Sequence, residues 1–263
     1  MSDLDRNYTS PFGRAAGRAD AAAVDAGLRA YMLRIYNYMS IGLAITGLAA
    51  LGVYMAAVTN DPSATAYHFR DISLTSFGYA MYFSPLKWLF FLAPLGMVFA
   101  ISAGINRIKP ATAQMLFWVF SALMGVSLSS IFLVYTHTSI VRVFFITAAS
   151  FGALSLYGYT TKRDLTGVGS FAIMGMFGIL IAMLVNVFLG STMMQFIISV
   201  VGVVVFSGLT AYDTQRLKND YIYGYASQGG AVAERASILG ALSLYLNFIN
   251  LFTFLLQLLG QRD

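Results

Sequence analysis

Asp213 is the acidic side chain that immediately follows the longest apolar segment of this sequence. It follows 48 consecutive residues without a formal charge, residues 165–212, and so ends the sixth expected membrane span. A carboxylate at the centre of a membrane helix costs about 2.5–3.5 kcal/mol on insertion scales, so acids near membrane depth usually serve a function. Binding a cation and exchanging a proton are the two kinds of chemistry that such a group can perform.

Small and polar residues form a second set, in the last apolar segment, residues 236–261. Their spacings of three, three, four, three and seven residues place them on one face of a helix. The set consists of Ser237, Gly240, Ser243, Asn247, Asn250 and Gln257. Because such a face should meet protein or water and not lipid, we expect this helix to be central, with six others around it. The polar residues could line a pathway, or they could simply hydrogen-bond to neighbouring helices.

Together the two sets suggest a latch between the sixth and seventh segments. A neutral Asp213 carboxyl could hydrogen-bond to Asn247 and hold the two helices together. An ionised one would favour a bound cation or Arg107, which follows the second segment, and the inner end of a pathway could open. Arg216 is a further partner, one helical turn after Asp213. In the other interpretation, Arg216 and water satisfy an interfacial Asp213 that has no gating role.

The composition is that of an integral membrane protein. Of the 263 residues, 58% are hydrophobic and only 10% are charged, whereas a soluble domain has about 25% charged residues. The absence of cysteine from the sequence excludes disulfides, zinc–thiolate sites and thiol catalysis. The formal charge of +5 comes from cations between apolar segments, so it indicates membrane topology and not nucleic-acid binding.

Segments without formal charge predict seven membrane helices. They are residues 35–60, 88–106, 110–141, 143–161, the two halves of 165–212, and 236–261. The 48-residue segment can hold two spans of about 20 residues each, with a hinge near Gly190 and Ser191. Because lipid cannot satisfy backbone polar groups, we expect an all-α bundle. Arg262 alone does not decide whether the last segment crosses the membrane or re-enters.

Lys and Arg residues predict the orientation. With the amino terminus inside, 12 of the 16 lie on the cytoplasmic side, whereas Arg70, Lys87 and Arg142 lie outside. We expect residues 1–27 to be a mobile cytoplasmic tail, with at most a short interfacial helix near residues 21–34. Residues 28–263 then form the seven-helix membrane domain, and the aromatic outer loop, residues 61–84, should pack at the membrane interface.

The sequence argues against an enzyme. An intramembrane aspartyl protease needs two carboxylates that share a proton, and no second Asp lies deep in an expected span. Both histidines, His68 and His137, fall in expected outer loops, where neither can act as an intramembrane base. A phosphate-binding Gly-x-x-x-x-Gly-Lys loop is absent from the sequence, which disfavours an ATP-driven pump. We expect no enzymatic activity and no cofactor. A proton-coupled carrier that uses Asp213 is a further alternative.

Several motifs occur in a recognisable order. They are 104–110 (GINRIKP), 127–132 (SLSSIF), 156–164 (LYGYTTKRD), 208–216 (GLTAYDTQR) and 241–252 (ALSLYLNFINLF). The last two resemble the carboxyl-terminal signature of the Bax inhibitor family, also called the transmembrane Bax-inhibitor-motif proteins, and the first three are similar to its bacterial branch. The resemblance covers nearly everything from about residue 29 to the end.

This resemblance implies six helices around a central seventh and a pH-sensitive calcium leak across a bacterial inner membrane. In the family's latch, one Asp ends the sixth span, a second Asp lies on the central helix, and an Arg near the end of the second span competes for them. Asp213 and Arg107 match the first Asp and the Arg, but the second Asp is Asn247 here. A single Asp that faces an Asn cannot titrate as a coupled pair.

The same difference affects calcium binding. Calcium prefers six to eight oxygen ligands, including carboxylates. Asp213, the amides of Asn247 and Asn250, and water would therefore make at most a weak, transient calcium site, which suits a leak. The expected partners are the lipid bilayer and calcium or other cations, with no nucleic acid.

The resemblance also implies an alternative function, because some bacterial relatives bind and restrain a membrane-anchored protease. The chain would then be a regulator without a channel. Its contact with the protease would be the amino-terminal tail or residues 214–235, and Asp213 would be structural only.

Overall fold

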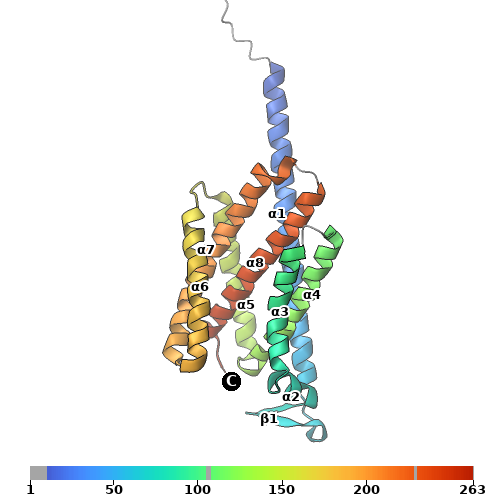
Figure 1. The fold of residues 1–263 in the computed structure, drawn as a ribbon, viewed down its shortest axis with the longest axis vertical. Coiled ribbons are helices and arrows are strands. Elements are labelled where there is room, and N and C mark those ends of the chain that lie inside the picture. Colours follow the sequence, from blue (N-terminus) through green and yellow to red (C-terminus); the bar gives the residue numbers. More distant parts are fainter. Residues whose placement is uncertain (1–10, 105–107, 228–229, 263) are drawn as a thin grey trace, which may run out of the picture.

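The computed structural model of the chain describes residues 11–104, 108–227 and 230–262 and is almost entirely helical (Figure 1). The α-helices are α1 (Pro11–Ala57), α2 (Ser76–Tyr82), α3 (Lys87–Gly104), α4 (Pro110–Leu128), α5 (His137–Thr160), α6 (Thr166–Leu189), α7 (Thr192–Tyr223) and α8 (Gly230–Leu259). Short 3-10 helices are η1 (Pro62–Ala64), η2 (Ser129–Leu133) and η3 (Tyr225–Ser227), and the strands are β1 (Tyr67–Phe69) and β2 (Ile72–Leu74).

The described helices confirm an all-α membrane protein. Six of them are long and apolar enough to cross a membrane: α1, α4 with η2, α5, α6, α7 and α8. The pair α2 and α3, which is bent by 59° at a short break, is a candidate for the seventh span. Pro85 lies in this break, and its fixed backbone geometry disfavours a continuous helix there.

The predicted hinge of the 48-residue segment is confirmed. Gly190 ends α6 in the left-handed backbone region, with a φ of 60°, which glycine adopts without steric cost. The Ser191 hydroxyl then caps α7 by accepting a hydrogen bond from the Met194 N–H at 3.2 Å. Two long apolar helices therefore pack as an antiparallel pair.

The short outer connection expected near His137 is confirmed, although the charge-free segments themselves divide later, at Arg142. α4 and η2 end at Leu133, and Thr136 caps α5, which begins at His137. The Thr136 side-chain oxygen accepts the Ser139 N–H at 3.2 Å. Arg142 therefore lies within α5, because a cap and not a charge sets the start of this helix.

The first helix is longer than the sequence suggests. α1 runs for 47 residues, about 70 Å, and its amino-terminal part extends beyond the bundle (Figure 1). Residues 11–27 are helical, so the expectation of at most a short helix near residues 21–34 is wrong. Alanine is frequent here and has the highest helix propensity of all residues. The cytoplasmic position and mobility of residues 1–27 stay predictions.

The outer loop contains a β-hairpin that the sequence analysis does not anticipate. Strands β1 and β2 pair antiparallel, with Tyr67 opposite Leu74. The Tyr67 ring lies 4.9 Å from that of Phe83 and 5.4 Å from that of Tyr79, both at α2. The aromatic residues of this loop therefore pack on one another and on α2.

The predicted central position of the last helix is confirmed. In its most apolar window, 67% of α8 is buried, compared with 11–33% of the other spans. α8 packs against α1, α4, α5 and α7, whereas α3 packs on α4 and α6 on α7 (Figure 1). Tyr245 of α8 is fully buried, and its hydroxyl lies 2.6 Å from the Thr46 hydroxyl of α1.

α8 also runs from one end of the bundle to the other and is long enough to cross a membrane without re-entering. Its 30 residues measure about 45 Å, more than the hydrocarbon core of about 30 Å. After α8, the Gln261 carbonyl accepts the Thr136 N–H at 3.0 Å. The carboxyl end thus reaches the loop before α5, on the side opposite the connection between α7 and α8.

Candidate functional site

Asp213 lies inside α7 and not at its end. α7 continues for ten residues, to Tyr223, whereas the charge pattern places Asp213 at the end of the span. The residue is only 5% exposed and faces α8. Gly202 allows the two helices to approach closely, because a Cβ atom there would lie 2.6 Å from the Phe254 ring of α8.

Three side chains satisfy the Asp213 carboxylate, which with them forms what we call the Asp213 cluster. Its Oδ2 atom accepts hydrogen bonds from Asn247 Nδ2 at 2.7 Å and from Ser243 Oγ at 2.9 Å. Its Oδ1 atom forms an ion pair with Arg216 Nη2 at 3.0 Å. The structure thus brings together four of the residues that the sequence analysis selected: Asp213, Arg216, Ser243 and Asn247.

The cluster has a buried and an exposed side. The Asp213 side chain is 7% exposed, but that of Arg216 is 41% exposed. The guanidinium also lies 5.8 Å from the centre of the Tyr212 ring. Arg216 can therefore leave the carboxylate for water, whereas Asn247 and Ser243 are fixed on the central helix.

This geometry changes one expectation. The latch hypothesis assigns the contact with Asn247 to a neutral Asp213. The Asn247 amide instead donates to Oδ2, and hydrogen bonds to an ionised acceptor are about twice as strong as neutral ones. The ionised carboxylate is therefore suited to hold α7 and α8 together.

The other residues of the polar face have different partners. Asn250 Nδ2 donates to the Leu246 carbonyl of its own helix at 2.8 Å. Gln257 Oε1 accepts the Ser199 hydroxyl of α7 at 2.7 Å. These bonds fit the structural interpretation of the face, and a role in lining a pathway stays a prediction. Arg107 lies outside the described residues, so its contact with Asp213 also stays a prediction.

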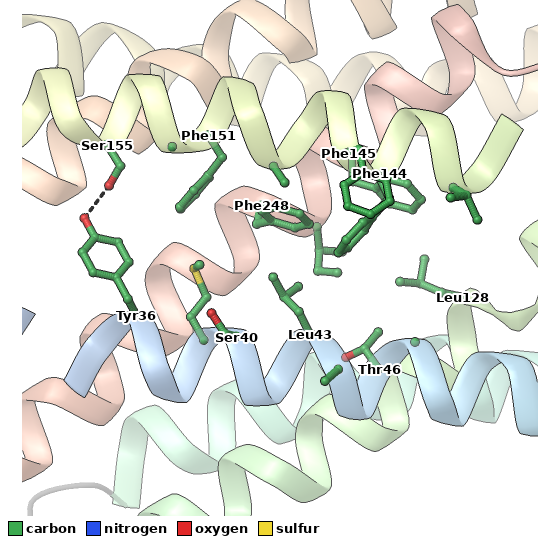
Figure 2. A pocket seen from close by; sticks show the side chains of 18 of the residues that line it. Tyr36, Ser40, Leu43, Thr46, Leu128, Phe144, Phe145, Phe151, Ser155 and Phe248 are labelled. Carbon is green, nitrogen blue, oxygen red and sulfur yellow. Dashed lines mark hydrogen bonds between the residues drawn. The ribbon is translucent and has the colours of Figure 1, made fainter. Parts of the chain in front are cut away.

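The residues after Asp213 connect α7 to α5 and to the loop before α6. Thr214 Oγ1 lies 2.9 Å from Ser155 Oγ of α5, which is hydrogen-bonded to the Tyr36 hydroxyl of α1 (Figure 2). The Gln215 amide donates to the Arg163 carbonyl at 2.7 Å and accepts the Leu165 N–H at 2.9 Å. Thr214 and Gln215 were expected only as part of a contact segment, residues 214–235, although three consecutive polar residues after an apolar segment are a signal for this packing role.

Metal-binding capacity at the cluster rests on one carboxylate. The described part of the chain contains no group of three or more His, Cys, Asp or Glu residues placed to hold a metal ion. Around Asp213, the amide of Asn247 and the hydroxyl of Ser243 are the additional oxygen ligands available.

Comparison with known proteins identifies the family. The sequence profile described as inhibitor of apoptosis-promoting Bax1 matches residues 28–263. An uncharacterized protein of Rickettsia prowazekii is 46% identical, over 90% of this chain and 92% of its own. An uncharacterized protein of Caulobacter vibrioides is 43% identical, over 99% and 98%. A protein of Escherichia coli K12 named inner membrane protein YbhL is 42% identical, over 90% and 94%. The chain therefore belongs to the Bax inhibitor-1 family of membrane proteins.

Proposed function

We propose that this protein is a slow, pH-sensitive leak for calcium or similar cations in a bacterial inner membrane, gated by the Asp213 cluster. Membership of the Bax inhibitor-1 family and the relative named an inner membrane protein support the location. The observation that supports gating is the buried carboxylate that side chains of two helices satisfy, next to a partly exposed Arg216. A carboxylate at membrane depth is a site at which a cation can replace protein donors.

The proposed orientation places the amino terminus in the cytoplasm. Lys162, Arg163, Lys218 and Arg235 lie where α5 and α7 end and α8 begins, on the side of the Asp213 cluster. Arg70, Lys87 and Arg142 lie on the opposite side, near β1, α3 and the start of α5. Because cytoplasmic loops carry an excess of Lys and Arg, this distribution favours a cluster near the cytoplasmic surface.

In the closed state, Asp213 is ionised and accepts hydrogen bonds from Asn247, Ser243 and Arg216. Protonation removes the charge that strengthens these bonds, releases Arg216 to water, and weakens the contact between α7 and α8. An arriving calcium ion would compete with the guanidinium for the same carboxylate oxygen. Asn247 and Ser243 would then present oxygen atoms, and water would complete a weak coordination shell.

The test is calcium uptake by liposomes that contain the purified full-length protein, at pH 6 and pH 8. We expect uptake above that of empty liposomes at both values, and faster uptake at pH 6. A variant that lacks residues 2–27 should conduct equally, because the proposed gate lies outside the tail. Uptake equal to that of empty liposomes at both pH values would overturn the leak and favour the regulator of a membrane protease.

A further inference from the structure

A wide groove lies between α1 and α5, beside α8 (Figure 2). Its volume is about 1570 Å³, larger than the roughly 300–1,000 Å³ of an ordinary small-molecule pocket. Leu43 on α1 and Phe144 and Phe151 on α5 form its walls, and Phe248 of α8 lies at its base. A hydrogen bond between Tyr36 and Ser155 joins the two walls.

The long axis of the groove follows α1, so it crosses the thickness of the bilayer. The α1 residues that line it extend from Asp25 to Leu51, a separation of 26 residues or about 39 Å, which spans a hydrocarbon core of about 30 Å and reaches the headgroup region at one end. All of them lie within the membrane span of α1. At its rim, Leu48 is 71% and Phe145 66% exposed. The groove is therefore open to the acyl chains of the membrane.

The two ends of the groove differ in charge. Arg29 and Asp25 line one end, close to Tyr159, whose carbonyl oxygen accepts a hydrogen bond from Lys218 Nζ at 2.8 Å. Lys218 does not line the groove itself but contacts Tyr159, which does, so Arg29 and Asp25 line this end and a second cation lies next to it. The other end is lined by apolar residues, among them Leu51, Leu128 and Phe132. Basic pockets between membrane helices on the cytoplasmic side are suited to anionic lipid headgroups.

We propose that this groove is a binding site for one phospholipid with an anionic headgroup. Its acyl chains lie against the phenylalanine side chains of α5 and α8, and its phosphate lies beside Arg29 and Lys218. The size, the membrane depth and the charge at a single end together favour this ligand over a soluble one. The site is separate from the Asp213 cluster, so lipid binding does not depend on ion conduction.

The proposal can be tested on the purified full-length protein by native mass spectrometry. Delipidated protein is titrated with phosphatidylglycerol or with phosphatidylcholine of the same acyl chains. The wild type should retain one phosphatidylglycerol in preference to phosphatidylcholine. Arg29→Gln should reduce this preference about fivefold, the usual effect of one cation near an anionic lipid surface.

Glycines supply matched variants. Gly152 and Gly47 line the groove, and a Cβ atom at either position meets no atom within 4 Å. Gly152→Leu and Gly47→Leu should therefore fill the groove without disturbing the fold. Gly178→Leu is the control, since Gly178 is equally open but lies on α6 outside the groove. We expect lipid retention to be lost in the first two variants and kept in the control.

Three results would overturn the proposal. One is equal retention of the two lipids by the wild type. Another is retention in Gly152→Leu and Gly47→Leu equal to that in Gly178→Leu, with the melting temperature of each variant close to that of the wild type. The third is a dimer mass that disappears in Gly152→Leu, because a second copy of the chain would then cover the groove.

Discussion

The two sides of the central helix are closed in different ways. Toward α7, polar side chains and small residues bring the helices into contact, and Asp213, Asn247 and Ser243 share hydrogen bonds across the gap. Between α1 and α5, the side chains are mostly apolar, with charged residues at one end, and the helices stand apart around a groove of about 1570 Å³. In a membrane, lipid can fill an apolar gap, but a buried carboxylate must find its partners within the protein. The first side is therefore suited to switching and the second to lipid.

The largest expected effect is on stability, and it distinguishes two glycines of α5, one that faces α7 and one that faces the groove. Gly158 of α5 packs against α7, where a Cβ atom would lie 2.1 Å from the Ala211 carbonyl oxygen, whereas Gly152 of α5 faces the groove. Gly158→Leu should destabilise the protein by about 3 kcal/mol or more through overpacking, and Gly152→Leu should leave its stability unchanged. Thermal unfolding in detergent measures both. Equal melting temperatures would contradict the contrast.

A smaller effect is expected from the carboxylate. Asp213→Ala removes the acceptor for the buried Asn247 amide and the partly buried Ser243 hydroxyl, and a buried donor that loses its partner costs about 1–3 kcal/mol. Asp213→Asn keeps an acceptor oxygen and should cost less. Unfolding of the two variants in the same detergent gives the comparison. If Asp213→Ala were as stable as Asp213→Asn, the hydrogen bonds at this carboxylate would not hold the helices together.

Charge-free segments and helix spacing are sufficient to predict the spans, the central α8 and the proximity of Asp213 to Asn247. These features of the fold depend on local sequence and on the cost of placing polar groups in lipid. Charge-free segments alone would start the fourth span after Arg142, whereas the Thr136 cap starts α5 at His137. The groove could not be predicted, since it depends on the separation of α1 and α5, which lie far apart in the sequence.

A further prediction concerns the contact between α8 and α1. The Tyr245 hydroxyl lies 2.6 Å from the Thr46 hydroxyl in the bundle core. Tyr245→Phe keeps the ring between Phe117 and Phe120 but removes this hydrogen bond. We expect a loss of about 1 kcal/mol, the usual net value of one hydrogen bond, seen as a small decrease in melting temperature. A Thr46→Val variant should show a similar decrease, and full stability in both would exclude a contribution from this bond.

The smallest effect is expected outside the membrane, before α6. Asp164 accepts hydrogen bonds from the Thr166 hydroxyl at 2.6 Å and the Thr166 N–H at 2.9 Å, and these lower the pKa of its carboxyl. Because the folded pKa lies below the unfolded one, the stabilisation is complete above the unfolded value of about 3.9 and is lost as pH falls through the folded value. NMR titration should show a higher Asp164 pKa in Thr166→Val. An unchanged pKa would contradict this assignment.

Calcium uptake by liposomes at pH 8 that carry Asp213→Asn is the most direct test of the gate. The neutral amide imitates a protonated Asp213, so we expect uptake faster than that of the wild type and independent of pH between 6 and 8. Asp71→Asn is the control, because Asp71 is an exposed acid beside the outer β-hairpin, and its uptake should equal that of the wild type. Wild-type rates and wild-type pH dependence in Asp213→Asn would show that this carboxylate does not gate the protein.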